Sequence, residues 1–186
     1  MLDKRINLVV DWLDLVERDS AESRIADALT RDAAKNAQRE VSQTATQAEL
    51  ARTAIHEAGH AVIAHVGGLR VRTVRIRGDA SGSCEYEGED EIALISADLA
   101  GVFAELADGA SIERQEALFH SSDILQARVR MDQLPHNWRR PLTVAAACAV
   151  ECHWLAIVRT ATALRALADL NQAELAALAF SDRSIK

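Results

Sequence analysis

The segment from Thr46 to Val66 is the strongest constraint on how this chain folds, because its residues favour one long helix. Thr46 and Glu49 have the spacing of a capping box, in which the two side chains satisfy free amides at a helix start. After them only Gly59 disfavours a helix, at about 1 kcal/mol relative to alanine. Gly67-Gly68 then supplies a helix end. The segment therefore predicts a single uninterrupted helix.

The remaining elements follow from changes in hydrophobic period. Alternating residues over Val71–Ile76 and a second run at Ser83–Tyr86 predict two short strands joined by a turn at Gly78–Gly82. The acidic run Glu85–Glu91 predicts a solvated loop. Helical periodicity returns over 92–108, 122–131 and 141–167, and a capping pattern at Asn171–Glu174 precedes a last short helix.

Composition supports a mainly helical core. The 186 residues include 35 alanines but only 8 glycines and 2 prolines, which argues against a many-turned β sandwich. We therefore expect a mainly α (α+β) domain over 46–186, with a small β-ribbon after the long helix. Residues 1–45 are expected to form a helical extension, amphipathic over 2–18.

Charge and cysteine content exclude several classes. The formal net charge of -7 disfavours a generic nucleic-acid binder. No apolar run approaches the ~18 residues of a membrane span, and the N-terminus does not resemble a signal peptide. Three cysteines, odd in number and widely spaced, do not suggest a disulfide framework. A cytoplasmic protein without a membrane span is expected.

The long helix carries an H-E-x-x-H motif, His56-Glu57-Ala58-Gly59-His60. Residues i and i+4 share a helix face, so His56 and His60 can bind one Zn²⁺. Glu57 lies on a neighbouring stripe, where its carboxylate can activate a zinc-bound water without being a ligand. This pattern predicts zinc-dependent hydrolysis.

A catalytic zinc usually has three protein ligands, and the third must come from downstream because Ile63 and Val66 replace the histidine-bearing extension of the motif. By chemistry alone the choice stays open. The candidates are His65, the acids of 85–91, Glu105, His120, Asp123, His136 and His153.

The segment Arg52–Val62 resembles the zinc-site helix of the FtsH-type ATP-dependent peptidases. The resemblance spans roughly residues 48–180 and continues in order through Val71–Gly78, Leu99–Gly109, Ser121–Arg128 and Leu164–Leu178. It implies that His56, His60 and Asp123 are the zinc ligands and that Glu57 is the catalytic carboxylate. His120 is the main rival to Asp123.

The chain also departs from that family, in which the peptidase domain is joined to a membrane anchor and an ATPase module. No G-x-x-x-x-G-K-[ST] sequence occurs, so the expectation is a peptidase domain that stands alone. A separate ATPase partner is a possibility, and the hexameric rings of the family make a homo-oligomer plausible.

Two functions are compatible with these residues. The first is a zinc endopeptidase that hydrolyses unfolded or flexible polypeptides. The alternative is a catalytically weak or inactive peptide-binding or regulatory module with a peptidase-like fold. The intact Glu57 favours the enzyme.

Three further features of the sequence carry smaller expectations. Cys148 and Cys152 are expected to be buried thiols rather than a second metal site with His153. Tyr86 is expected to pack in its strand, although a role as a transition-state donor is open. The strand Val71–Ile76 is a candidate for pairing with an extended substrate.

Overall fold

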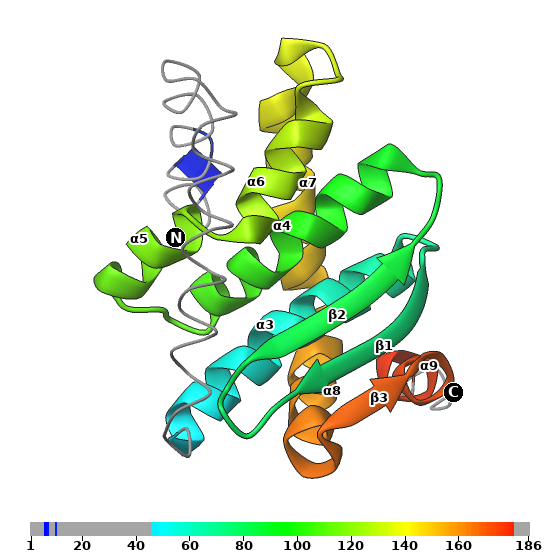
Figure 1. Ribbon diagram of the computed structural model, residues 1–186. Helices are drawn as coiled ribbons and strands as arrows, with labels where there is room; N and C mark the ends of the chain where they lie inside the picture. The colour runs from blue at the N-terminus through cyan, green and yellow to red at the C-terminus, as the bar shows by residue number, and fades with distance from the viewer. Residues whose placement is uncertain (1–5, 8–9, 11–45, 181–186) are drawn as a thin grey trace.

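The computed structural model describes residues 6–7, 10 and 46–180 of the chain (Figure 1). Its helices are α3 (Gln47–Val66), α4 (Glu91–Ala107), α5 (Ile112–Phe119), α6 (Ser122–Met131), the short 3-10 helix η2 (His136–Trp138), α7 (Arg139–Cys152), α8 (Trp154–Leu167) and α9 (Gln172–Phe180). Its strands are β1 (Arg70–Ile76), β2 (Gly82–Glu87) and β3 (Asp169–Asn171). The expected mainly helical class with a small β component is confirmed.

Helix α3 lies at the centre of the fold, as Figure 1 shows, between α4, α8 and the strands. The predicted capping box at its start is confirmed, since Glu49 N donates to Thr46 Oγ1 and Thr46 N donates to Glu49 Oε2. Residues 57–64 are all buried, so the helix is enclosed on every side. Such enclosure is typical of a core helix and fixes the direction of its side chains.

Helix α4 crosses α3 closely because both helices carry small residues at the contact. A Cβ at Gly59 would lie 2.7 Å from the backbone oxygen of Ala100 and 2.8 Å from Cβ of Ala104. The glycine that weakens α3 as an isolated helix is therefore needed for its packing. This close crossing brings side chains of α4 against the motif face of α3.

The three strands form an antiparallel sheet in the order β2-β1-β3. The β1–β2 hairpin was predicted, but the acidic run is not one loop: Glu85–Glu87 belongs to β2, and Asp90 caps α4. β1 is the central strand: it pairs with β2 along one edge, and its residues Thr73–Arg75 pair with β3 along the other. The suggestion that Val71–Ile76 pairs with a substrate is therefore contradicted over Thr73–Arg75, and β2 is the edge strand of the sheet next to β1.

Three elements differ from the sequence prediction. Helix α5 and strand β3 were not predicted, and both are short. The helix expected over 141–167 is two helices, α7 and α8, bent by 69°. In the part of the chain that the structure describes, no single helix is long and apolar enough to cross a membrane; this bent pair meets the length and composition criteria together.

The N-terminal extension can be followed only at a few positions. Ile6 and Val10 are buried. The rest of the helical extension predicted over 1–45, amphipathic over 2–18, lies outside the described residues.

Candidate metal centre

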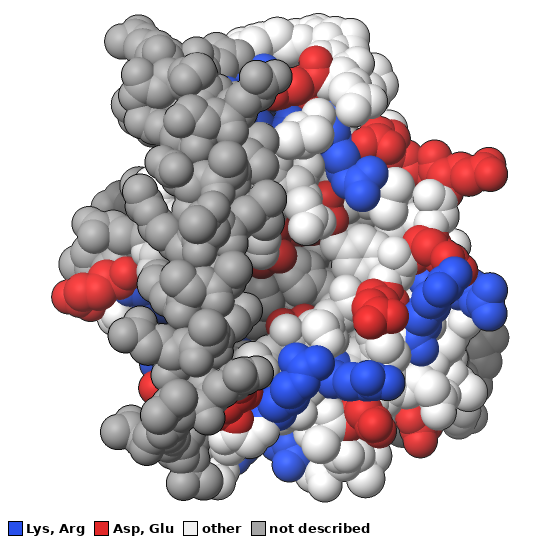
Figure 2. All heavy atoms as spheres, in the orientation of Figure 1, with Lys and Arg blue, Asp and Glu red and all other residues white. Residues whose placement is uncertain are grey.

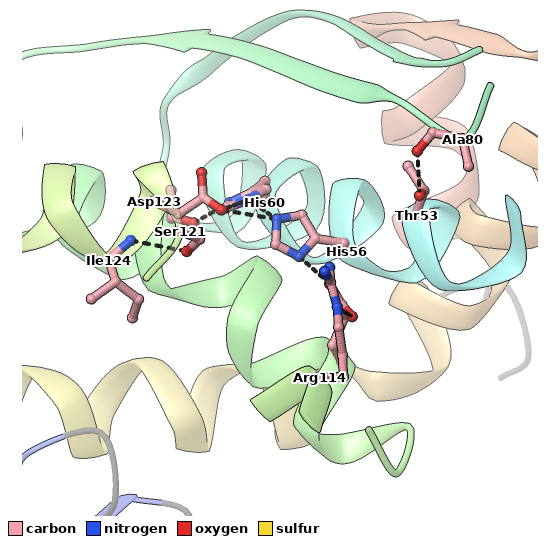
Figure 3. A network of polar contacts seen from close by, with 10 residues as sticks. Thr53, His56, His60, Ala80, Arg114, Ser121, Asp123 and Ile124 are labelled. Atoms are coloured by element: carbon pink, nitrogen blue, oxygen red, sulfur yellow. Dashed lines mark hydrogen bonds and ion pairs between the residues drawn. The ribbon is translucent and has the colours of Figure 1, made fainter. Parts of the chain in front are cut away.

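His56 and His60 lie one turn apart on the face of α3 that packs against α4, and the first turn of α6 approaches this face through one side chain (Figure 3). Their Nε2 atoms are 3.0 Å apart, and the rings are nearly perpendicular at 76°. His60 is buried and His56 is mostly buried, so both rings are held in place by packing. The i, i+4 spacing of the motif therefore produces the convergence that it predicts.

Asp123 reaches the same point from α6. Ser121 caps this helix through a hydrogen bond from Ile124 N, and Asp123 sits in its first turn, as predicted. Asp123 Oδ2 lies 3.0 Å from His56 Nε2 and 3.7 Å from His60 Nε2. Two ligand atoms of a tetrahedral zinc are about 3.3 Å apart, given bond lengths near 2.0–2.1 Å. The three atoms therefore have the spacing of three zinc ligands.

Each histidine is oriented by a partner on its other ring nitrogen. His60 Nδ1 lies 2.7 Å from the backbone oxygen of Ala97, which can only accept, so Nδ1 carries the proton and Nε2 keeps its lone pair. His56 Nδ1 lies 2.8 Å from Oε1 of Glu105, a side chain with no exposed surface. Such partners fix the ring and its tautomer in metal-binding histidines.

Glu105 is in turn fixed by Arg114 of α5. Arg114 Nε donates to Glu105 Oε2 at 2.7 Å, and its Nη2 donates to Oε1 at 2.6 Å. This bidentate pair keeps the buried carboxylate ionised, and its pKa is lowered because the hydrogen bonds outweigh the effect of burial. Glu105 therefore supports His56 rather than binding metal. The sequence offered no signal for Arg114, which lies across a loop.

The other candidate ligands do not join this cluster. Among the described residues, the one group of three potential ligands within 4.8 Å of one another is His56, His60 and Asp123. His120 is the exposed C-cap residue of α5. The remaining candidates outside the group are His65, the acids of 85–91, His136 and His153.

The second possible metal site does not form either. Cys148 and Cys152 are both exposed on α7, so the expectation that they are buried thiols is wrong. The alanine-rich side of α7 faces the core instead, through residues such as Ala146 and Ala147.

Two glycines make room for the centre. A Cβ at Gly101 of α4 would lie 2.8 Å from His56 Nε2 and would collide with His60 Nε2. A Cβ at Gly82 of β2 would lie 2.6 Å from Cγ of Glu57 and would collide with its Oε1. Neither role was predicted, although an isolated glycine within a helical pattern, as at Gly101, is a signal of close packing.

Glu57 is buried beside the three ligand atoms without being one of them. Burial raises its pKa above the usual value, although the charges of His60 and His56 oppose this effect. Thr53, one turn earlier, donates to the backbone oxygen of Ala80 at 2.8 Å and ties the β1–β2 turn to α3 (Figure 3). The turn thus covers the Glu57 side of the helix.

The electrostatics of the cluster call for a cation. Burial disfavours a charged His56, but Asp123 and Glu105 outweigh it and raise the pKa of His56 to about 10. Burial likewise opposes ionisation of Asp123, yet the charges of His60 and His56 hold its pKa well below the usual range. Two lone pairs and a carboxylate meet with no donor between them. A proton or a metal ion must therefore supply the positive charge.

Two cavities open on opposite sides of the cluster, of about 540 and 600 Å³. We call the first the turn-side cavity, since the β1–β2 turn and α5 line it, and the second the strand-side cavity, lined by β2, Asp98 and Arg130. The two share the residues His56, Glu57, Gly82, Ser122 and Asp123. Together they form a groove that runs through the centre beside the edge strand.

Tyr86 lies in the strand-side cavity. Its hydroxyl donates to the buried carboxylate of Asp98, which also accepts from Arg130 Nε at 2.9 Å. The Tyr86 ring packs against the core, as expected, and its centroid is 6.4 Å from that of His60. This network joins β2, α4 and α6 along one wall of the groove.

Comparison with known proteins supports the metallopeptidase class. Residues 36–105 match the model of the Peptidase M50B-like family, a family of zinc metallopeptidases. The matched stretch contains His56, Glu57, His60 and Glu105, and ends before Asp123. This family is distinct from the FtsH-type peptidases, so the match supports the resemblance only at the level of metallopeptidases. No curated protein matches the chain.

Proposed function

We propose that this chain is a zinc-dependent endopeptidase that hydrolyses peptide bonds of unfolded or flexible polypeptides. The observation that carries the proposal is the convergence of His56 Nε2, His60 Nε2 and Asp123 Oδ2 beside the buried carboxylate of Glu57. Two imidazoles and one carboxylate are a donor set that suits zinc, and three protein ligands leave a position for water or substrate. The orienting contacts to Glu105 and Ala97 add the outer shell that such sites use.

A bound Zn²⁺ supplies Lewis acidity and lowers the pKa of water toward ~7. The protein's own contribution to proton transfer is Glu57. Burial raises the pKa of Glu57 toward neutral pH. A group whose pKa lies near the working pH can both accept and return a proton. Glu57 takes the proton of the attacking water as the peptide carbonyl becomes tetrahedral, and passes it to the amine as the C–N bond breaks.

The edge strand supports a polypeptide substrate. Within the described part of the chain, β2 pairs with β1 on one side only, and it lines both cavities of the groove. An extended chain can add to such an edge through main-chain hydrogen bonds, which depend little on sequence. An enzyme with this mode of binding acts on segments that are free of their own secondary structure.

The ligand arrangement also fits the finer resemblance to FtsH-type peptidases. In both, two histidines come from one helix and an aspartate from the start of a later helix. We therefore also propose that the chain is an FtsH-like peptidase, that it works with a separate ATPase, and that it associates with copies of itself.

The proposal is tested with a Glu57→Gln variant. Zinc per chain is measured by mass spectrometry of metals, and cleavage of casein is followed with zinc-loaded protein and with a chelator. We expect about one zinc per chain in both proteins, and cleavage only by the unmodified chain without chelator. Glu151→Gln, at an exposed carboxylate of α7 that lines neither cavity, is the matched control and should cleave normally. Zinc-loaded protein that fails to cleave casein or flexible peptides would favour the binding module, and cleavage by Glu57→Gln would refute the mechanism.

A further inference from the structure

The two halves of the groove differ in how their charged side chains are paired. The strand-side cavity contains the guanidinium groups of Arg72 and Arg130. Each is committed to carboxylates, Arg72 to Glu87 and Arg130 to Asp98. Both arginines of this half therefore have an ion-pair partner among the described residues.

The turn-side cavity contains the guanidinium groups of Arg77 and Arg114. Arg114 uses Nε and Nη2 for Glu105, and its Nη1 has no partner among the described residues. Arg77 makes one hydrogen bond, from Nη1 to Ser81 Oγ at 3.4 Å, and no ion pair within the described part of the chain. Arg77 is exposed and the Arg114 side chain is 38% exposed, so solvent can reach the N–H groups that these contacts leave unused.

Two carboxylates outside the centre line the same half, Glu105 and Asp79. Glu105 is shared between Arg114 and His56. Asp79 Oδ1 accepts from the backbone N and the hydroxyl of Ser81, at 2.9 and 2.7 Å, which lowers its pKa. Arg77 adds to that effect at longer range. The turn-side cavity thus holds one arginine without an ion pair among the described residues, Arg77, and a second, Arg114, whose Nη1 is not used by Glu105. Its acidic lining is Glu57 and Asp123 of the centre, Glu105, and Asp79, which stays charged and has no hydrogen bond at Oδ2 among the described residues.

The donors come from opposite sides of the cavity. Arg77 belongs to the β1–β2 turn, which Thr53 and Ala80 fasten to α3, and Arg114 belongs to α5. In Figure 2 basic side chains, drawn in blue, lie over the strands among acidic side chains, drawn in red. An extended substrate lying along β2 passes between these two walls when it leaves the centre on this side.

We propose that the turn-side cavity is a subsite for a carboxylate of the substrate, either an Asp or Glu side chain or the C-terminal carboxylate, bound between Arg77 and Arg114. Arginine suits this task because its planar N–H groups match a carboxylate. This subsite adds a substrate preference to the proposed peptidase function and rests on that function. Such a subsite makes the enzyme prefer substrates that carry a carboxylate on one particular side of the scissile bond.

A binding experiment tests the subsite without requiring cleavage. The protein is the zinc-loaded full chain with Glu57→Gln, and the probes are flexible ten-residue peptides of Ala, Gly and Ser with an uncharged fluorophore at the N-terminus. One series carries a single Asp at successive positions, with Asn in the matched series. A second pair has either a free or an amidated C-terminus. Fluorescence anisotropy gives the affinity of each.

We expect one register of Asp, or the free C-terminus, to bind about three- to tenfold more tightly than its neutral partner. The advantage should shrink as salt is raised, because an exposed ion pair is screened. Which series shows it identifies the source of the carboxylate. Equal affinity of every charged peptide and its neutral partner would overturn the proposal.

Substitution of Arg77 assigns the site. When Arg77→Gln is added to the Glu57→Gln protein, the charged peptides should bind no more tightly than their neutral partners. Arg77→Lys should keep part of the difference in affinity. Arg75→Gln is the matched control, an exposed arginine on β1 that does not line either cavity. An advantage that survives Arg77→Gln would mean that the carboxylate binds elsewhere, for example at the zinc, and would also overturn the proposal.

The same peptides separate this inference from the function on which it rests. If the unmodified chain cleaves Asp and Asn peptides at equal kcat/KM, the peptidase stands and the subsite fails. If it cleaves none of them while Glu57→Gln binds the charged peptides more tightly, the subsite stands and the peptidase fails.

Discussion

His56 lies between two carboxylates, one on each ring nitrogen. Glu105 contacts Nδ1 at 2.8 Å and Asp123 contacts Nε2 at 3.0 Å. The two acids act differently because Glu105 is neutralised by Arg114, whereas Asp123 faces the open centre of the cluster. One carboxylate therefore raises the basicity of the His56 ring, and the other would share with His56 the metal ion that we propose.

Glu105→Gln tests the orienting role. The amide can still accept from His56 Nδ1 but no longer carries charge, and it leaves Arg114 without its ionic partner. We expect zinc affinity to fall about 10- to 100-fold, the usual effect of losing such a partner. Competition with a zinc chelator measures it. Glu113→Gln, an exposed acid on α5, is the control and should bind zinc normally; equal affinities of both variants would argue against the role of Glu105.

Asp123→Asn compares the two rivals for third ligand. We expect zinc affinity to fall by more than the ~10- to 100-fold that an outer-shell partner provides, because a ligand itself is weakened. His120→Asn should leave zinc affinity unchanged, since His120 lies outside the cluster. Zinc titration of both proteins at one pH gives the comparison. The opposite ranking would make His120 the ligand and require a rearrangement between α5 and α6.

The sequence predicted these residues unequally, for a physical reason. His56, Glu57 and His60 belong to one helix, so local spacing alone places them on adjoining stripes. Asp123 lies 67 residues from His56, and only resemblance to a family selected it among several acids and histidines. Whether Glu105 orients a histidine or binds the metal depends on which nitrogen of the His56 ring it contacts. That is decided by the crossing of α3 and α4, which no local pattern encodes.

At the scale of elements, the close approach of α4 to α3 makes the metal centre possible. Gly59 lets the backbones meet, and Gly101 then faces the two imidazoles without a side chain between them. The strand–turn–strand unit closes the other side through Thr53 and Ala80. The centre is therefore shaped by two long-range contacts, between α4 and α3 and between the β1–β2 turn and α3, which local sequence patterns do not predict.

Gly101→Ala is expected to displace the histidines. A methyl group there would collide with His60 Nε2 and lie 2.8 Å from His56 Nε2, so a ring or the helix must shift. We expect the protein to lose most of its zinc while its far-ultraviolet circular dichroism stays the same, because alanine favours the helix. Gly78→Ala is the matched control, since nothing lies within 4 Å of a Cβ there. Full zinc binding by Gly101→Ala would show that the rings can move aside freely.

Most elements could be predicted because their signals are local. The capping boxes before α3 and α9, and the alternation in β1, depend on neighbours in sequence. The break at His153 between α7 and α8 has no proline or glycine to announce it. Strand β3 has three residues, and its pairing with β1 alone makes it a strand.

For the whole molecule, a metal ion would join segments that are distant in the chain. His56 and His60 come from the central helix, whereas Asp123 begins α6, which contacts α4. Binding to the folded state alone stabilises it by about 2.7 kcal/mol when free zinc is 100 times its dissociation constant. Zinc should therefore raise the unfolding temperature as a property of the entire domain.

The pH dependence of that stabilisation follows from the charges of the cluster. In the metal-free protein the raised pKa of His56, about 10, stabilises the fold fully below pH ~6.5 and progressively less as pH rises toward 10. The lowered pKa of Asp123 stabilises the fold above pH ~4 and less as pH falls below it. Between these limits the metal-free cluster is held together by a proton on His56.

Zinc must displace that proton, so its apparent affinity should rise about tenfold per pH unit for each proton released, over pH 6–8. We therefore expect the gap in unfolding temperature between zinc-loaded and metal-free protein, measured by differential scanning calorimetry at fixed free zinc, to widen from pH 6 to pH 8. Calorimetric titration in buffers of different ionisation enthalpy counts the protons. Asp123→Asn should show a smaller gap that changes less with pH, because His56 loses the partner that keeps it charged. A gap that is constant over this range would contradict proton displacement and would place the metal away from His56.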